Sequence, residues 1–362
     1  MQKEMIGLFT LTAVALLGGC GGIVGQLPEA MPSRSVQTVR VAPSEDDATG
    51  QIQSAIDKAF LSGGGTVRLT KGEYRIGGIR LRSRVTLYLE TGAKLKGSRN
   101  IEDYYILEKD TVEPVDPKLI SHERWYQSDT LYKDTIWRYP GNRWNNALIR
   151  LYKAEDAAII GEPGSQIDGS SPYDPEGEEQ YRGPLGINAI DCKRLKFKGY
   201  TINGTGNWAH RLVDVVGFEF DNVTCLGGHD SIHFNGCDDV LIENCTFKTG
   251  DDCVAGFDNH RVTVRNCYIN SSCSAFRFGG NDVLVEKCTG RCKSFFHVQS
   301  WSQYHDAKGR SPAELKSHAD GVTLRDNVIE AKNVKDLVRR DDVFEISNLV
   351  FENNLVNGVE VK

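Results

Sequence analysis

The residues best suited to chemistry lie between positions 228 and 257, in GHDSIHFNGCDDVLIENCTFKTGDDCVAGF. Asp230 comes first, and the pair Asp251 and Asp252 follows one sequence repeat later. Three carboxyl groups held close together cannot all stay ionised, so at least one should have a raised pKa and keep its proton. A protonated carboxyl can protonate a leaving oxygen while an ionised neighbour activates water, as in glycoside hydrolysis. In an inverting reaction, about 6.5–9.5 Å between the two groups leaves room for that water.

A repeat of about 20 residues must position these acids. Segments such as FEFDNVTCLGG, VLIENCTFKTG and VTVRNCYINSS each hold an alternating apolar strand, then Asn or a charged residue, then a turn. Leucine-rich repeats have a similar period, but two or three short β-branched runs per unit, joined by Gly and Asn turns, favour a parallel β-helix. Stacked strands lie about 4.8 Å apart, so outward residues one coil apart become neighbours. The sequence therefore predicts an all-β, single-stranded parallel β-helix whose three aspartates converge on one exposed patch.

Cysteines and asparagines follow the same period. Small apolar thiols at equivalent inward positions should stack, so the cysteines predict two buried ladders. Asn222, Asn244 and Asn266 recur at equal intervals and predict a third ladder, in which amides bond to neighbouring turns. The two cysteine series are Cys225, Cys245, Cys267 and Cys288, and Cys253, Cys273 and Cys292.

The pair Asp251 and Asp252 needs a bend in the chain. Adjacent residues of a regular strand point to opposite faces, so both acids reach one patch only if the strand bends. Gly250, in KTGDDC, is where such a bend can begin. The alternative is a turn that carries two solvated acids.

Cations accompany the acids in the repeat. Counting coils places His233, Arg277 and His297 on one outward column. Arg277 is a candidate for binding a substrate carboxylate or for pairing with Asp252, and the alternative is a purely structural partner of the aspartates.

Two further histidines are candidates for substrate binding. His229 and His233 flank Asp230, and both imidazoles are expected to titrate or to donate to sugar hydroxyls. His210, two positions after Trp208, is either a second substrate-binding residue or a structural one.

The N-terminus is typical of an exported protein. Residues 1–20 hold Lys3, a short apolar run and LGGC, which predicts a lipoprotein signal peptide with lipid attachment at Cys20. An ordinary cleaved signal is the alternative. Either predicts a cell-envelope (outer membrane or periplasmic) or secreted protein whose only membrane contact is through the lipid. Residues 21–40 are predicted to form a flexible tether.

The remaining residues, 41–362, predict one β-helix domain, because a chain with 40% apolar residues can bury one large core. GQIQSAIDKAFLSGGG predicts a short α-helix that caps the N-terminal end of the coils, where sheet edges would otherwise be open. An insertion rich in Trp and Tyr, at about 102–146, interrupts the period. The predicted inward face of the helix consists of Ile52, Ala55, Ile56, Ala59 and Phe60.

Several motifs resemble those of the polygalacturonase family, glycoside hydrolase family 28, from about residue 41 to 300. They are the entry segment GGGTVRLTKGEYRIGGIRLRSRVTLYLETGAKLKGS, then GSQIDG, RGP, NWAH, GHD and GDD. The resemblance implies a right-handed β-helix and metal-free, cofactor-free inverting hydrolysis of a pectic or related plant polysaccharide. It also implies that Asp251 is the general acid and that Asp252, with Asp230, activates water.

The chain departs from that family at its basic motifs. Ser274 and Ala275 stand near the place of the family's Gly-His-Gly, and His297 and Gln299 near that of its Arg-Ile-Lys. A formal net charge of −6 would also repel an acidic polymer unless the groove is locally basic. Candidates for that local charge are Arg211, Lys248, Arg261 and Arg277. A neutral pectic sugar is the alternative substrate.

Two other functions compete with hydrolysis. A β-helical polysaccharide lyase would use Ca²⁺ held by aspartates and a basic residue that abstracts a proton. A surface protein that binds glycans without turnover would explain the missing basic motifs. The expected partner is in each case a polysaccharide or oligosaccharide, and the sequence has no nucleic-acid motif or basic stripe.

Overall fold

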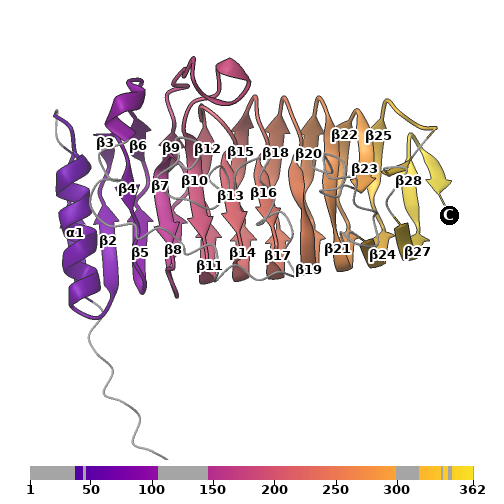
Figure 1. Ribbon diagram of the computed structural model, residues 1–362, viewed down its shortest axis with the longest axis horizontal. Coiled ribbons are helices and arrows are strands. Elements are labelled where there is room, and N and C mark those ends of the chain that lie inside the picture. The colour runs from indigo at the N-terminus through magenta and orange to yellow at the C-terminus, as the bar shows by residue number, and fades with distance from the viewer. Residues whose placement is uncertain are drawn as a thin grey trace, which may run out of the picture. The chain divides into compact units, whose positions relative to one another are not determined.

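The protein is a right-handed, single-stranded parallel β-helix with one short α-helix, so the predicted fold class is confirmed. Figure 1 shows the coils following one another in chain order, from α1 and β2 at one end to β27 and β28 at the other. The predicted signal peptide, Cys20 and nearly all of the aromatic insertion lie outside the described residues. The computed structural model describes residues 37–43, 46–104, 146–298, 318–335, 337–340 and 345–361.

Three ladders of stacked strands form the walls of the coils. Two of them join into one sheet because the long strands β19 and β21 serve both. Ladder 1 contains β4 (Ile79–Arg80), β7 (Ala147–Tyr152), β10 (Leu185–Ile190), β13 (His210–Val213), β16 (Ile232–Asn235), β19 (Val254–Arg265), β21 (Ser274–Glu286), β23 (Ser294–Val298) and β26 (Val338–Arg340). Ladder 2 contains β1 (Gln37–Val41), β2 (Gly65–Leu69), β5 (Val85–Leu89), β8 (Ala158–Gly161), β11 (Lys193–Lys198), β14 (Val216–Asp221), β17 (Asp238–Glu243), β19, β21, β24 (His318–Arg325) and β27 (Glu345–Glu352). Ladder 3 contains β3 (Gly72–Ile76), β6 (Ala93–Gly97), β9 (Gln166–Asp168), β12 (Thr201–Asn203), β15 (Thr224–Gly227), β18 (Thr246–Thr249), β20 (Tyr268–Ser271), β22 (Thr289–Cys292), β25 (Val328–Ala331), β28 (Asn354–Val356) and β29 (Val359–Val361).

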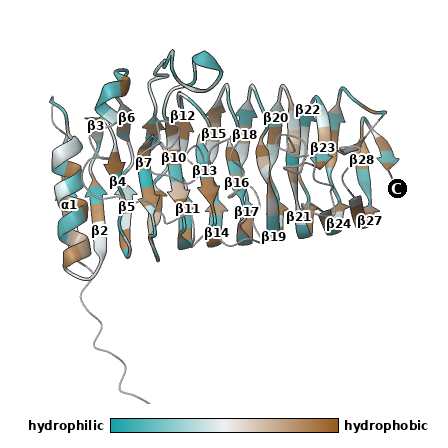
Figure 2. Cartoon of the chain, viewed as in Figure 1, coloured by the Kyte–Doolittle hydropathy of each residue, from teal (hydrophilic) through white to brown (hydrophobic). Residues whose placement is uncertain are grey.

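The core is built by alternation along each strand. In β11, Leu195 and Phe197 are buried while the four other residues of KRLKFK are exposed. Equivalent inward residues stack on one another, so the rings of Phe197 and Phe220 lie 4.5 Å apart between centroids. Figure 2 shows the same alternation of hydrophilic and hydrophobic residues along the strands. Outward positions on ladder 1 are therefore free to carry polar groups.

The helix α1 (Thr49–Leu61) packs on the first coil, as predicted. It begins where the Asp47 carboxylate accepts a hydrogen bond from the Thr49 N–H, and it is followed by Gly63 with φ of 94°. A residue with positive φ is a common way to end a helix, and glycine adopts it without strain. The buried face of α1 consists of Ile52, Ala55, Ile56 and Ala59, with Phe60 partly buried.

The predicted cysteine ladders are only partly correct. Cys245, Cys267 and Cys288 stack in one buried row, because Phe247 pairs with Ile269 and Ile269 with Gly290, two positions further along each strand. Cys225 instead pairs with Phe247 and belongs to the next inward row. The second series is wrong. Cys253 lies in the row of Ala275, Cys273 in that of Lys293, and Cys292 in that of Ala331, because coil length varies and equal spacing does not guarantee an equal position. The described cysteines are free thiols.

The asparagine column has a backbone cause. Asn222, Asn244 and Asn266 have φ of 55°, 55° and 54°, the left-handed region that asparagine tolerates better than most residues. The Asn244 amide also donates to Asp221 of the preceding coil at 2.9 Å, as the ladder prediction requires for that residue.

The ends of the domain differ from the predicted limits. Strand β1 pairs with β2, so the last residues of the predicted tether, 37–40, are part of the fold. At the other end, β28 and β29 form an antiparallel hairpin. The short η1 (Ile101–Tyr104) lies directly before the undescribed insertion. Of the helices in the described ranges, none has the length and apolar character that a membrane-spanning segment needs.

Candidate active site

The three aspartates lie in turns that lead from ladder 3 into ladder 1. Asp230 lies between β15 and β16, and Asp251 and Asp252 lie between β18 and β19. The second turn packs closely on the first, because a Cβ on Gly250 would lie 2.7 Å from the Gly228 carbonyl oxygen. Gly250 therefore permits the close approach of the two turns, and both acids that follow it lie outside the regular strands.

Asp252, and not Asp251, is the residue one coil on from Asp230. Ile232 pairs with Val254, so Asp230 and Asp252, each two positions earlier, are equivalent in successive coils. The Asp252 N–H donates to Asp230 Oδ1 at 3.1 Å. One carboxylate oxygen each of Asp251 and Asp252 lie within 4.8 Å of each other. The predicted convergence is thus confirmed, but this pair is closer than the separation of about 6.5–9.5 Å expected for an inverting pair.

The prediction of an exposed patch is wrong for two of the three acids. Asp230 and Asp252 are 4% and 1% exposed, whereas the Asp251 side chain is 30% exposed. His233 and Arg277 lie against the two buried carboxyls and help to cover them. Among the described acids of this cluster, only Asp251 is open to a large ligand.

Asp252 is held as an ion-paired acceptor. Its Oδ1 accepts a hydrogen bond from the Ser274 N–H at 2.8 Å, and Arg277 Nη1 donates to Oδ2 at 3.3 Å. Arg277 reaches it from the outward side of β21, between the buried Phe276 and Phe278. The contact with Asp252 fits both the expected pairing and the structural alternative for Arg277, and Ser274, in place of the missing Gly-His-Gly motif, supplies a backbone donor.

Asp230 and His233 form a buried pair. His233 Nδ1 lies 2.8 Å from Asp230 Oδ2, and the imidazole stacks on Trp208 with ring centroids 3.8 Å apart. Burial, followed by the charges of Asp252 and Asp251, raises the pKa of Asp230 well above its usual range. Burial, followed by Arg211 and Arg277, lowers the pKa of His233. A neutral carboxyl can donate to a neutral imidazole at Nδ1, which fits both pKa directions.

Asp251 faces a loop whose importance the sequence analysis missed. Arg182 Nη2 lies 3.5 Å from Asp251 Oδ2, and its Nε donates to Glu179 at 3.0 Å. Burial, followed by the Asp252 charge, raises the pKa of Asp251 in spite of Arg182. Arg182 belongs to the RGP motif and follows η6 (Glu178–Gln180), far before Asp251 in the chain. The motif was therefore a signal, although the period gave no reason to place it here.

His229 and Tyr181 form an aromatic edge beside Asp251. Their rings stack with centroids 6.2 Å apart, and Tyr181 is 43% exposed. Burial and the nearby Arg182 lower the pKa of His229 to about 4, so it is neutral at ordinary pH. Exposed tyrosine rings can stack on sugar faces, which makes this edge a candidate binding surface.

His210 is not a substrate-binding residue. It is fully buried, with Nδ1 2.9 Å from the Ser231 carbonyl oxygen and Nε2 2.9 Å from the Tyr200 hydroxyl. The structural interpretation is therefore correct, because inward residues of β13 face the core. Its pKa is lowered to about 4 by burial.

The remaining basic residues lie on different ladders of the β-helix. Arg211, His233 and Arg277 occupy one outward column of ladder 1, and His297 follows Phe296, the partner of Phe276. That column was predicted, and His297 is buried within it. Arg261 instead pairs with Asp238 and Asp239 at a turn of ladder 2, and Lys248 is exposed on ladder 3, so neither lies on this column.

The acids do not form a good calcium site. Ligand atoms of Asp251, Asp252 and Cys273 lie within 4.8 Å of one another. Ca²⁺ takes oxygen ligands, and a thiol whose pKa is raised to about 11 by burial is a poor partner for it. This donor set does not favour the lyase alternative.

No protein-family model matches the chain, and no curated protein matches it. Several solved structures do. The family 28 exopolygalacturonase of Yersinia enterocolitica is 14% identical, over 89% of this chain and 66% of that one, with a TM-score of 0.56. The polygalacturonase of Erwinia carotovora is 13% identical, over 91% and 96%, with a TM-score of 0.53. The exopolygalacturonase of Thermotoga maritima is 14% identical, over 90% and 93%, with a TM-score of 0.51. The chain thus has the β-helix fold of polygalacturonases.

Proposed function

We propose that the protein is a glycoside hydrolase, a divergent relative of family 28 polygalacturonases, that cleaves a pectic or related plant polysaccharide. The observation that carries the proposal is Asp251, a partly exposed carboxyl with a raised pKa beside two further aspartates. A general acid must hold its proton and be open to the leaving oxygen. The fold shared with polygalacturonases supports the same chemistry.

In this mechanism, Asp251 protonates the leaving oxygen and Asp252 activates water. Asp252 is 1% exposed and held by Ser274 and Arg277, so its oxygens cannot advance to a sugar carbon as a nucleophile must. An ionised carboxylate has about four acceptor sites, which leaves capacity for one small water. Burial therefore favours water activation and inversion, although the separation from Asp251 is shorter than usual for that class.

Asp230 supports Asp252 from the coil below. Its Oδ1 accepts from the Asp252 N–H, which fixes the position of that residue, and its protonated form avoids a second negative charge beside Asp252. On the outer side, Arg182, His229 and Tyr181 line the approach to Asp251 and are the proposed sugar contacts. Export, with lipid attachment at Cys20, would bring the protein to such a substrate.

The test is release of reducing ends from pectic oligosaccharides and polysaccharides. The wild type should cleave at least one fraction, and Asp251→Asn should lose about 10²–10⁴-fold in rate, the usual contribution of a general acid. Asp239→Asn removes an exposed carboxylate on ladder 2 and should leave the rate unchanged. Proton spectra of fresh product should show the inverted anomer, and a retained anomer would contradict the role of Asp252.

Glycan binding without turnover is the second candidate. The burial of Asp230 and Asp252 favours it, because a substrate reaches only Asp251 directly. If no cell-wall fraction releases reducing ends and Asp251→Asn binds glycan as tightly as the wild type, this candidate is correct and hydrolysis is not.

A further inference from the structure

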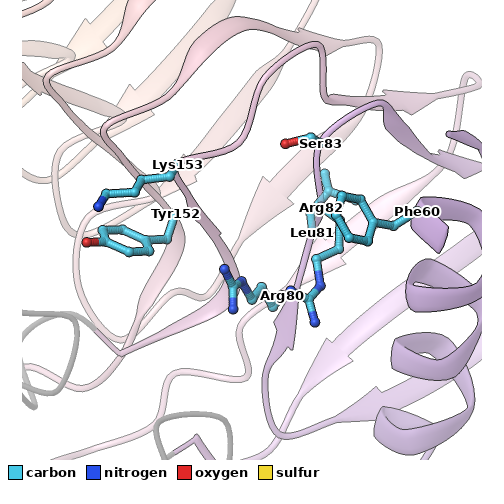
Figure 3. Close-up of a pocket in the computed structure, with 7 residues that line it drawn as sticks. All are labelled: Phe60, Arg80, Leu81, Arg82, Ser83, Tyr152 and Lys153. Carbon is cyan, nitrogen blue, oxygen red and sulfur yellow. The ribbon is translucent and has the colours of Figure 1, made fainter. Parts of the chain in front are cut away.

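A pocket of about 300 Å³ lies at the other end of ladder 1, beside α1. Figure 3 shows Tyr152 and Lys153 on one side of it, Phe60 and Arg82 on the other, and Arg80 below. Small-molecule sites start at about this volume, so one monosaccharide-sized ligand fits. Of the described residues that line the pocket, none is acidic.

The charge of the pocket is unbalanced. Arg80 Nε is buried and has no hydrogen-bond partner among the described residues, and no carboxylate there pairs with its guanidinium. The neighbouring Arg82 already pairs with Asp57 at 2.9 Å. Lys153 adds a further cation, with Nζ 5.2 Å from the centre of the Tyr152 ring. Burial, followed by the charges of Arg82 and Arg150, lowers the pKa of Arg80, and the charge of Asp57 opposes this shift without cancelling it.

The pocket is separate from the acid cluster. Arg80 pairs with Arg150, Arg150 with Asn188, Asn188 with Arg211, and Arg211 with His233. Four steps of about 4.8 Å put Arg80 about 19 Å from His233 along the ladder. A ligand the size of one sugar cannot occupy both places.

We propose that this pocket is a second binding site, for a monosaccharide-sized oxyanion such as a sugar carboxylate or a sugar phosphate. Arg80 provides a guanidinium that no described carboxylate pairs with, and its planar donors match either oxyanion. Lys153 adds a second positive charge, and the rings of Tyr152 and Phe60 give apolar surface for the sugar. This binding does not depend on hydrolysis at the aspartates.

Calorimetric titration of the full chain with galacturonate, glucose 6-phosphate and galactose tests the proposal. One saturable site is expected for an anionic sugar, and neutral galactose should not bind there. The tighter of the two anions identifies the oxyanion. Binding should weaken at least about tenfold in Arg80→Gln, because a charge-assisted hydrogen bond is lost. Lys153→Gln, at an exposed position, should weaken it as well, which guards against a folding defect in the first variant.

The matched control is Arg75→Gln, an exposed arginine on β3 of ladder 3, which should bind as the wild type does. Asp251→Asn should also bind normally. Binding that survives Arg80→Gln and Lys153→Gln, or that disappears in Asp251→Asn, would overturn the proposal, as would no binding of either anion. A wild type that binds an anionic sugar here but releases no reducing ends from any fraction would overturn only the proposed function.

Discussion

The acid cluster of Asp230, Asp251 and Asp252 and the pocket beside Arg80 lie on the same ladder, but their charged groups differ in whether they have partners of opposite charge. In the cluster, Asp252 pairs with Arg277 and Asp251 with Arg182, while Asp230, with its raised pKa, shares a hydrogen bond with His233, whose pKa is lowered. In the pocket, no carboxylate among the described residues pairs with Arg80. One region has its charges compensated by the protein, and the other leaves a cation for a ligand.

One position in each coil differs between the two regions. Asp230 lies two positions before Ile232 of β16, and Asp252 takes the equivalent position in the next coil. Gly77 lies two positions before Ile79 of β4, in the same row of the register. The outward column carries cations near both regions, and the acid in that row provides Arg277 with a carboxylate partner that Gly77 cannot provide for Arg80.

Arg277→Gln removes the cation that pairs with the buried Asp252 and should have the largest effect on stability. It leaves the 1%-exposed Asp252 without its cation, and losing one partner of a buried pair costs about 3–5 kcal/mol. Because Arg277 is 25% exposed, we expect about 3 kcal/mol less free energy of unfolding in urea titrations. Arg261→Gln breaks a pair of surface bridges and should cost about 1 kcal/mol or less. Equal losses in both variants would show that burial of Asp252 does not matter.

The buried His210 links the core to the turn that carries Asp230, because its Nδ1 lies against the Ser231 carbonyl oxygen. The folded pKa of about 4 lies below the ordinary 6.5. The stability that the neutral, buried His210 contributes to the folded state is therefore fully present above pH 6.5 and is lost as the pH falls through about 4. The difference corresponds to roughly 3 kcal/mol.

Asp230 and Asp251 act in the opposite direction. Their pKa values are raised, so the stability they contribute is present at low pH and is lost as pH rises. The difference between wild type and His210→Asn isolates the histidine. Urea unfolding between pH 7 and 4 should show a shallower loss of stability in the variant, and parallel curves would contradict a buried neutral imidazole.

The fold was predictable because its signals repeat in every coil. Alternation such as that of Leu195 and Phe197 recurs from coil to coil, and the same period brought Asp230 beside the Asp251–Asp252 pair. The exact register was not predictable. Coil length changes with turns and with the irregularity between Gly256 and Asn259 in β19, and this displaced the predicted cysteine rows.

The surroundings of the acids were the least predictable part. Burial of Asp230 depends on His233, which is held by the ring of Trp208 from the preceding coil. Arg182 comes from a loop outside the period, several coils before Asp251 in the chain. Spacing within a repeat predicts which backbone positions are neighbours in successive coils. It does not predict which side chains from loops outside the period cover those positions.

Gly250→Ala changes the turn directly before Asp251 and Asp252 and gives the smallest stability effect of the three. Its Cβ would lie 2.7 Å from the Gly228 carbonyl oxygen, and overpacking of this kind costs about 1–3 kcal/mol. Because the turn positions Asp251 and Asp252, hydrolysis should also fall at least about tenfold. Gly228→Ala, whose Cβ meets nothing within 4 Å, should be nearly neutral. Gly77→Ala, with a Cβ 2.5 Å from the Asp103 carbonyl oxygen, should lose similar stability but keep the rate. If Gly77→Ala slowed hydrolysis as much as Gly250→Ala, the two regions would not be independent.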